Sequence, residues 1–197
     1  MGRVSRAVAD QHREQVVAAA ARLLRERGLE GVSVAEIMAE VGLTTGGFYR
    51  QFDSKDALAA EAIGEAFNET LGTMAGFVDQ HRDDRERARQ ELADFYLSAE
   101  SRDFPGSSCP STAFGSDVAR EEPTSPLRAA YVEGVRRFIE VLAGFDDDND
   151  AAAARRDHIL TLCTLVGALH LARGTAGDPL SDEILDSARA YLLRAGH

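Results

Sequence analysis

The sequence predicts an all-helical protein of about nine helices, in which a three-helix head precedes a larger helical body. Apolar residues recur three and four positions apart through most of the chain, which is the spacing of helices with one buried face. Short polar residues and glycines stand where such helices would begin and end. No alternating apolar and polar pattern of useful length, which would predict a strand, is present.

The composition limits the class of protein. The chain has 197 residues, of which 44% are hydrophobic and 28% charged, which suits one compact unit or a small domain docked on a larger one. The longest strongly apolar stretch, residues 159–172, is too short for the roughly 20 residues that span a bilayer. Residues 1–6 lack the apolar core of a signal peptide, and two cysteines argue against a disulfide scaffold. We therefore expect a cytoplasmic protein without a membrane partner.

The charge is unevenly distributed. Residues 1–56 hold eight basic and eight acidic side chains, so the whole net charge of −11 lies in residues 57–197. A polyanionic partner would therefore have to be met by the N-terminal segment.

The first two helices of the head are predicted from their ends. A helix over 11–27 has one apolar stripe, and Gly28 can end it in a left-handed conformation. Ser33 and Glu36 then form a capping box, in which each side chain bonds the other residue's backbone.

A helix-turn-helix follows within residues 33–52. Gly42 allows a sharp turn, and Thr44 can cap a third, short helix that runs from 45 to about 51. The second helix would brace the third, whose polar start could enter a major groove. Residues 53–56 carry a further capping signal, which opens a long helix.

Small and hydrogen-bonding residues gather around this third helix. Threonine hydroxyls can reach phosphates or base edges, and glycines permit close approach of the backbone to DNA. Tyr49 and Arg50 offer a hydroxyl and a cation for phosphates. The positive charge of Lys55 is unfavourable at the start of the next helix, where the helix dipole is also positive. A phosphate bound at this position would offset that cost. The candidate DNA contacts are Ser33, Thr44, Thr45, Gly46, Gly47, Tyr49, Arg50 and Lys55.

About residues 11–60 resemble the tetracycline-repressor (TetR) family of bacterial transcription regulators. The similarity is specific only when its short blocks are taken together, since each of them is common. Gln51 stands where the family often has histidine. The blocks are Ala19-Ala20-Ala21-Arg22-Leu23-Leu24 with Gly28 and Gly31, Ser33-Val34-Ala35-Glu36-Ile37, Val41-Gly42-Leu43, Gly47-Phe48-Tyr49-Arg50-Gln51-Phe52 and Ser54-Lys55-Asp56-Ala57-Leu58.

The resemblance implies a DNA-binding domain over 1–56 and a ligand-binding and dimerisation domain over 57–197. It further implies a homodimer that binds a palindromic double-stranded DNA operator, and a small-molecule effector that releases it. Three classes of function remain open: a regulator, most simply a repressor; a helical small-molecule-binding protein without a DNA role; and a cysteine-dependent enzyme. We expect no enzymatic activity, because the phosphate-loop, dinucleotide and Gly-x-Ser-x-Gly motifs are absent. The histidines show no metal-ligand spacing, and we expect no cofactor.

The elements of the body follow from the same signals. We expect Ser181 to cap the last helix. The predicted helices cover about 82–100, 110–120, 127–145, 151–173 and 181–195, with loops at 101–108, 121–126 and 174–180.

The last two helices are predicted to form the dimer interface. The helix over 151–173 is apolar on most of its circumference, so it should be buried on two sides. A partner chain would cover the second side, although a core within one chain remains an alternative. Cys163, which lies in this helix, is interpreted as inert packing.

Two features of the body are candidates for sensing a signal. Phe67, Tyr96, Phe114 and Tyr131 could line a ligand cavity or form ordinary core. Cys109 begins a short helix, and a helix N-terminus favours the thiolate form of a cysteine. Some TetR-type regulators carry a similar Gly-x-x-Cys-Pro stretch before the sixth helix, and in part of that group the cysteine senses oxidants or electrophiles. Cys109 is therefore either a sensor thiol or a small packed residue.

Overall fold

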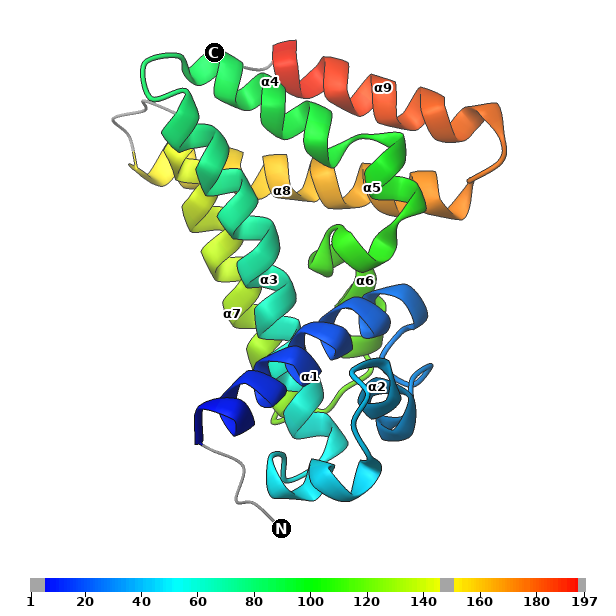
Figure 1. The fold of residues 1–197 in the computed structure, drawn as a ribbon. Coiled ribbons are helices and arrows are strands. Elements are labelled where there is room, and N and C mark those ends of the chain that lie inside the picture. Colours follow the sequence, from blue (N-terminus) through cyan, green and yellow to red (C-terminus); the bar gives the residue numbers. More distant parts are fainter. Residues whose placement is uncertain (1–5, 146–150, 195–197) are drawn as a thin grey trace.

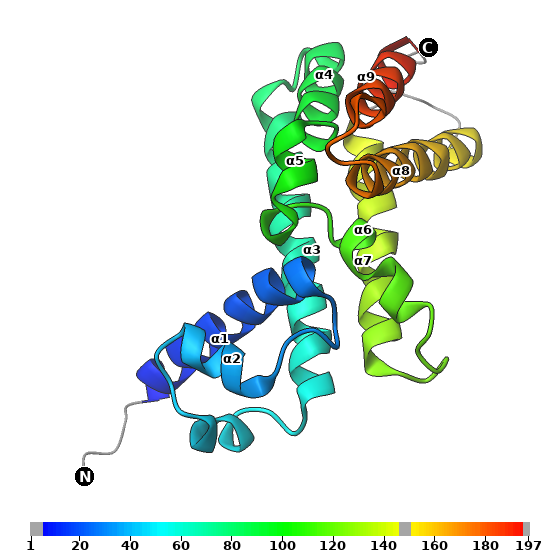
Figure 2. The ribbon, with the colours of Figure 1, turned by 90° about the vertical axis from the view of Figure 1, so that its right-hand side faces the viewer.

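A computed structural model describes residues 6–145 and 151–194, and every regular element in this part of the chain is a helix. The head contains helix α1 (Arg6–Arg27), helix α2 (Val34–Glu40) and the 3₁₀ helix η1 (Thr45–Arg50). It lies at one end of the molecule, and the long helix α3 (Lys55–Gln80) leads away from it into the body (Figures 1 and 2). Helix α1 begins five residues earlier than the predicted position 11.

Where the structure describes it, the body consists of six further α-helices and two short 3₁₀ turns. Helix α7 runs beside α3, whereas α4, α8 and α9 lie at the end far from the head (Figures 1 and 2). The elements are α4 (Arg85–Tyr96), α5 (Ala99–Asp103), η2 (Pro105–Ser107), α6 (Pro110–Val118), α7 (Pro126–Leu142), η3 (Ala143–Phe145), α8 (Ala151–Gly174) and α9 (Pro179–Arg194).

The predicted helix over 82–100 is wrong in its extent, and the predicted loop over 101–108 is mostly helical. The chain breaks at Leu97, because Ser98 accepts a hydrogen bond from the amide of Ser101 at 3.0 Å and opens α5. Helix α4 starts only at Arg85, where Asp84 caps it. Asp84 and Ser98 thus start separate helices within a charged stretch whose sequence predicts one continuous helix.

The predicted cap at Ser181 is also wrong. Helix α9 begins at Pro179, and its first turn is capped by Asp178, whose carboxylate accepts from the amide of Leu180 at 2.9 Å. Ser181 is buried and donates instead to the carbonyl of Ala172 at 2.8 Å. The predicted end of this helix, residue 195, lies outside the described residues.

Head and body share α3 and one continuous core. The first half of α3 buries Leu58 and Ile63 near α1, and its second half packs along α7, where Phe67 and Met74 are fully buried. Movement of α3 therefore affects both parts of the molecule. None of the helices among the described residues is long and apolar enough to cross a membrane.

Candidate nucleic-acid interface and body sites

Helix α2 has the capping box that the sequence predicts. The Ser33 hydroxyl accepts from the Glu36 amide at 3.2 Å, and the Glu36 carboxylate accepts from the Ser33 amide at 2.8 Å. These backbone and side-chain hydrogen bonds from Ser33 lower the pKa of Glu36. Ile37 and Met38 are buried beneath the helix. The hydroxyl of Ser33, a candidate DNA contact, is thus already engaged in holding the brace helix.

The third helix of the motif exists, but it is a 3₁₀ helix. The amide of Gly47 donates to the carbonyl of Thr44 at 3.1 Å, three residues back. Thr44 makes no side-chain capping bond, so its predicted capping role is wrong. Phe48 is fully buried and stacks on Phe52 with ring centroids 5.4 Å apart. One aromatic anchor therefore fixes η1 to the head.

The start of η1 points to solvent. Thr44, Thr45 and Gly46 are exposed, as is Arg50, and Tyr49 is 74% exposed. A Cβ atom built on Gly46 would meet nothing within 4 Å. Packing within the chain therefore does not require a glycine at position 46. A glycine is expected there if the surface of another molecule approaches the backbone closely.

Glycine at position 47 is also free of tight packing. A Cβ atom there would make only an ordinary contact, 3.9 Å from Cε of Met38. Close packing within the chain therefore requires neither glycine of the motif.

Lys55 lies at the start of α3, beside this surface. Ser54 caps the helix by accepting from the amide of Ala57 at 3.0 Å. The ammonium of Lys55 lies 3.8 Å from a carboxylate oxygen of Glu30, whose side chain is 98% exposed. An exposed pair at this distance is worth little, so a phosphate could take the place of Glu30.

The body contains a buried polar cluster around Cys109. This residue is 2% exposed and is the N-cap of α6, where its sulfur accepts from the amide of Thr112 at 3.2 Å. The Tyr96 hydroxyl donates to the same sulfur. Burial raises the pKa of Tyr96 well above its ordinary value. Burial also lowers the pKa of Arg173, which lies close enough to the sulfur and Tyr96 for electrostatic interaction.

The four candidate aromatic residues lie in a packed core. Phe67, Phe114 and Tyr96 are at most 2% exposed, and Tyr131 is half-buried with its hydroxyl donating to the Ser111 carbonyl at 3.1 Å. A Cβ atom built on Gly134 would lie 2.1 Å from the Phe67 ring, so this ring fills its space completely. Two open pockets, one between α8 and α9 and one lined largely by residues of α1, include none of these aromatic residues.

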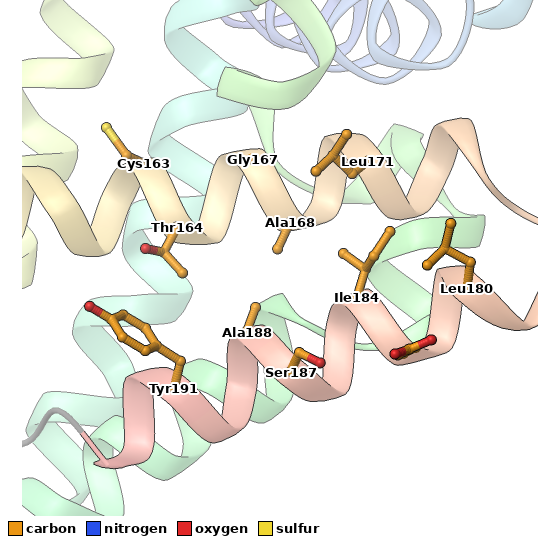
Figure 3. A pocket seen from close by; sticks show the side chains of 11 residues that line it. Cys163, Thr164, Gly167, Ala168, Leu171, Leu180, Ile184, Ser187, Ala188 and Tyr191 are labelled. Carbon is orange, nitrogen blue, oxygen red and sulfur yellow. The ribbon is translucent and has the colours of Figure 1, made fainter.

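Helices α8 and α9 form an exposed apolar face. A groove of about 500 Å³ runs between them (Figure 3). Leu160, Leu171 and Tyr191 are 62%, 57% and 60% exposed. Cys163 lines this groove and is exposed, so the prediction that it is packed is wrong for the single chain. Apolar residues lie on two sides of α8 because one side is buried in the body and the other lines the open groove.

Three buried or half-buried polar residues that link elements were not predicted from the sequence, namely Arg25, Asp117 and Arg173. Arg25 lies four residues after the buried Ala21, so its position on the inner face of α1 was open to prediction. Its partners are distant in sequence and gave no signal. Among the described residues, no group of histidine, cysteine and carboxylate side chains could hold a metal ion.

Fold and surface together define a helix-turn-helix DNA-binding protein with a helical body. Residues 16–62 match the model of the tetR family of bacterial regulatory proteins. A search of curated proteins by sequence found no match.

Solved structures match nearly the whole chain. The reduced form of Escherichia coli NemR matches with a TM-score of 0.77 and 18% identity, over 92% of this chain and 95% of that one. A TetR-family regulator from Agrobacterium tumefaciens matches with a TM-score of 0.76 and 16% identity, over 96% and 100%. Bacillus subtilis FadR in complex with stearoyl-CoA matches with a TM-score of 0.64 and 14% identity, over 93% and 99%.

The family match rests on the head, and the structural matches extend the same fold through the body. The head therefore carries the DNA-binding domain of the tetR family of bacterial regulatory proteins, which identifies a DNA-binding transcriptional regulator, and the chain has the fold of the matched structures.

Proposed function

We propose that this chain is a cytoplasmic, non-enzymatic repressor that binds a palindromic operator as a homodimer and is released by a chemical signal. The observation that carries the proposal is the exposed start of η1. Thr45, Gly46 and Tyr49 face outward there, and Lys55 stands beside them at the start of α3. This arrangement suits insertion of a short helix into the major groove, flanked by phosphate contacts.

Dimer formation is supported by the α8–α9 face. Leu171 and Tyr191 line the groove and are exposed, and Leu160 on α8 is exposed as well, whereas a second copy of the chain would bury such an apolar surface. A closed two-fold dimer would also present two copies of η1 to two half-sites. Replacing Leu171 by Glu should therefore yield monomers in sedimentation analysis, whereas Val132→Glu on α7, also at an exposed apolar residue, should leave the dimer intact. A dimeric L171E protein would contradict this interface.

The signal is proposed to act on the body. The matched FadR structure holds stearoyl-CoA, which supports a small-molecule effector for a body of this shape. Here Phe67, Tyr96, Phe114 and Tyr131 pack tightly, so an effector would have to open this core. The alternative signal is a thiol reagent at Cys109, whose sulfur already accepts from Tyr96 and Thr112.

The central test is a selection of bound sequences from a random pool of DNA duplexes at low ionic strength. We expect enrichment of a palindromic site by the parent protein, and weaker binding with unchanged site preference by a Tyr49→Phe variant. Thr45→Val should instead change the preferred bases. A parent protein without preference for any duplex would overturn the proposed function.

A further inference from the structure

Helix η1 depends on its aromatic residues for its position. It is six residues long, contains Gly46 and Gly47, and has no side-chain capping bond at its start. Glycines weaken a helix, and the hydrogen bonds of a 3₁₀ helix have poorer geometry than those of an α-helix. Phe48 is fully buried, and its carbonyl accepts from the amides of Gln51 at 2.8 Å and Phe52 at 3.0 Å. The orientation of η1 therefore follows from how firmly Phe48 and Phe52 are held.

Three rings form an aromatic cluster here, namely those of Phe48, Tyr49 and Phe52. The rings of Phe48 and Phe52 are stacked with centroids 5.4 Å apart. The Tyr49 ring meets the Phe48 ring edge to face, with centroids 5.0 Å apart, although Tyr49 is 74% exposed. Aromatic pairs have preferred geometries. The position of Phe52 therefore constrains Phe48, and Phe48 in turn constrains the exposed Tyr49.

Arg13 of α1 covers the ring of Phe52. Its guanidinium carbon lies 4.7 Å from the ring centroid, within the about 6 Å over which a cation is attracted to a ring face. Arg13 lies three residues before the fully buried Val16, so it continues the inner stripe of α1 by one turn. A long basic side chain at the margin of a core lays its hydrocarbon stem on apolar surface and keeps its charge near water.

Glu61 of α3 binds the same guanidinium. Nη2 of Arg13 donates to Oε1 of Glu61 at 2.5 Å, and both side chains are 40% exposed. Arg13 thereby connects α1 with α3 and with Phe52, which follows η1. An exposed ion pair contributes little by itself, whereas a planar guanidinium can stack on a ring. The contact with Phe52 is therefore the stronger constraint on η1.

We infer that Arg13 is a positioning residue for DNA recognition, which holds η1 through Phe52 and Phe48. This inference rests on the proposed function, since η1 must meet DNA for its orientation to matter there. Contacts of Thr45 and Tyr49 with a particular site need a fixed geometry, whereas general attraction to phosphates does not. Loss of Arg13 therefore lowers affinity for the operator more than affinity for a random duplex.

Arg13→Gln tests this role, with Arg27→Gln as its control. Arg27 lies on the same helix and forms an exposed ion pair with Glu36 at 3.3 Å, but its guanidinium lies over no aromatic ring within the described residues. One exposed cation–π contact changes an equilibrium about two- to fivefold. Loss of two such contacts in a dimer should weaken operator binding about tenfold and binding to a random duplex less than twofold. The control should change neither affinity more than twofold.

Hydrogen exchange without DNA tests the positioning by itself. Residues 45–52 include the amides of Gln51 and Phe52, which are bonded to the Phe48 carbonyl. In the Arg13→Gln protein these amides should exchange about two- to fivefold faster. The Arg27→Gln protein should keep the rates of the parent. Unchanged exchange in the Arg13→Gln protein would overturn the inference, whatever its DNA binding.

Salt dependence separates positioning from a direct phosphate contact of Arg13. If both copies of Arg13 lay on phosphates, Arg13→Gln would lower the slope of log K against log salt by about 1.8. It would also weaken operator and random duplex equally. Positioning predicts an unchanged slope and unequal losses, so either result of a direct contact would overturn the inference.

Two more variants locate the effect within the cluster. Tyr49→Phe should weaken operator binding less in the Arg13→Gln protein than in the parent, because residues that act through one another are not additive. Glu61→Gln keeps an acceptor oxygen for the guanidinium and should change operator affinity less than twofold. A tenfold loss in the Glu61→Gln protein would assign the effect to the ion pair and contradict the role of the ring.

The outcomes keep the two proposals apart. A parent protein without preference for any duplex would contradict the proposed function, while hydrogen exchange would still decide how η1 is held. An Arg13→Gln protein with the parent's ratio of operator to random-duplex affinity would overturn the inference alone. Should this variant fail to fold, Arg13→Lys keeps a charge beside Glu61 but presents no planar group to Phe52. It should then lower the affinity ratio and speed exchange, and parental values of both would overturn the inference.

Discussion

Replacement of Lys55 by Gln tests the docking of the head most directly. Within residues 6–145 and 151–194, the Lys55 ammonium forms an ion pair with Glu30 at 3.8 Å, and the Glu30 side chain is 98% exposed. Such a pair contributes at most about 1 kcal/mol, so the lysine loses little when a phosphate replaces the carboxylate. Removal of one cation from a DNA phosphate lowers the slope of log K against log salt by about 0.9.

The magnitude follows from the proposed dimer. Two copies of the chain place two lysines on phosphates, so the slope should fall by about 1.8. Between 50 and 200 mM salt, the parent protein should then lose about twelvefold more affinity than the variant does. Fluorescence anisotropy titrations at four salt concentrations measure both slopes on the selected operator.

The control removes the same charge at the far end of the same helix. Arg82 is exposed and follows the end of α3, roughly 40 Å from Lys55 at 1.5 Å per residue. Arg82→Gln should leave the slope unchanged. An unchanged slope in the Lys55→Gln protein would refute the placement of this lysine on the DNA backbone.

Three further substitutions separate DNA contact from folding. Gly46→Ala should leave thermal stability within about 0.5 kcal/mol of the parent, because a Cβ atom there meets nothing within 4 Å. The same variant should bind the operator at least tenfold more weakly. Equal binding would contradict a close approach of this backbone to DNA. Gly134→Ala should instead destabilise the fold by about 1–3 kcal/mol in denaturant unfolding, because its Cβ atom would lie 2.1 Å from the ring of Phe67; an unchanged midpoint would contradict the packing of that ring. Ser33→Ala should cost about 1 kcal/mol of stability with no change in the bases selected, since its hydroxyl is bound to Glu36; altered base preference would show that Ser33 contacts DNA directly.

The sequence predicted those features whose causes lie within one turn of helix. The box of Ser33 and Glu36 and the capping signal within residues 53–56 are both confirmed, and in the second the capping residue is Ser54, which bonds an amide three residues on. The cap at Ser181 failed because tertiary partners engage the hydroxyl, which donates to the carbonyl of Ala172 and accepts from the guanidinium of Arg102. Local sequence shows that a serine can cap a helix, but not what else lies within its reach.

Longer-range features could not be predicted for a different reason. The sequence of α8 has apolar residues on two faces of the helix. Only the packing of the body shows which face stays exposed and that Cys163 lies on it. Arg25 reaches partners 44 and 83 positions away in the sequence. These interactions depend on how the helices pack, which the apolar periodicity within one helix does not predict.

The distribution of charge has a consequence for how the protein meets DNA. Residues 1–56 are neutral overall, whereas residues 57–197 carry the net charge of −11. At physiological ionic strength the field of the body is screened beyond about 8 Å, so its repulsion of the phosphate backbone acts only when the body itself approaches. Orientations that bring the acidic body towards the DNA are thereby disfavoured. The head, which carries Arg50 in η1 and Lys55 at the start of α3, approaches the DNA with little electrostatic repulsion. Adding basic residues to the exposed surface of α7 should therefore raise non-specific DNA binding more than operator binding and lower the ratio of the two affinities.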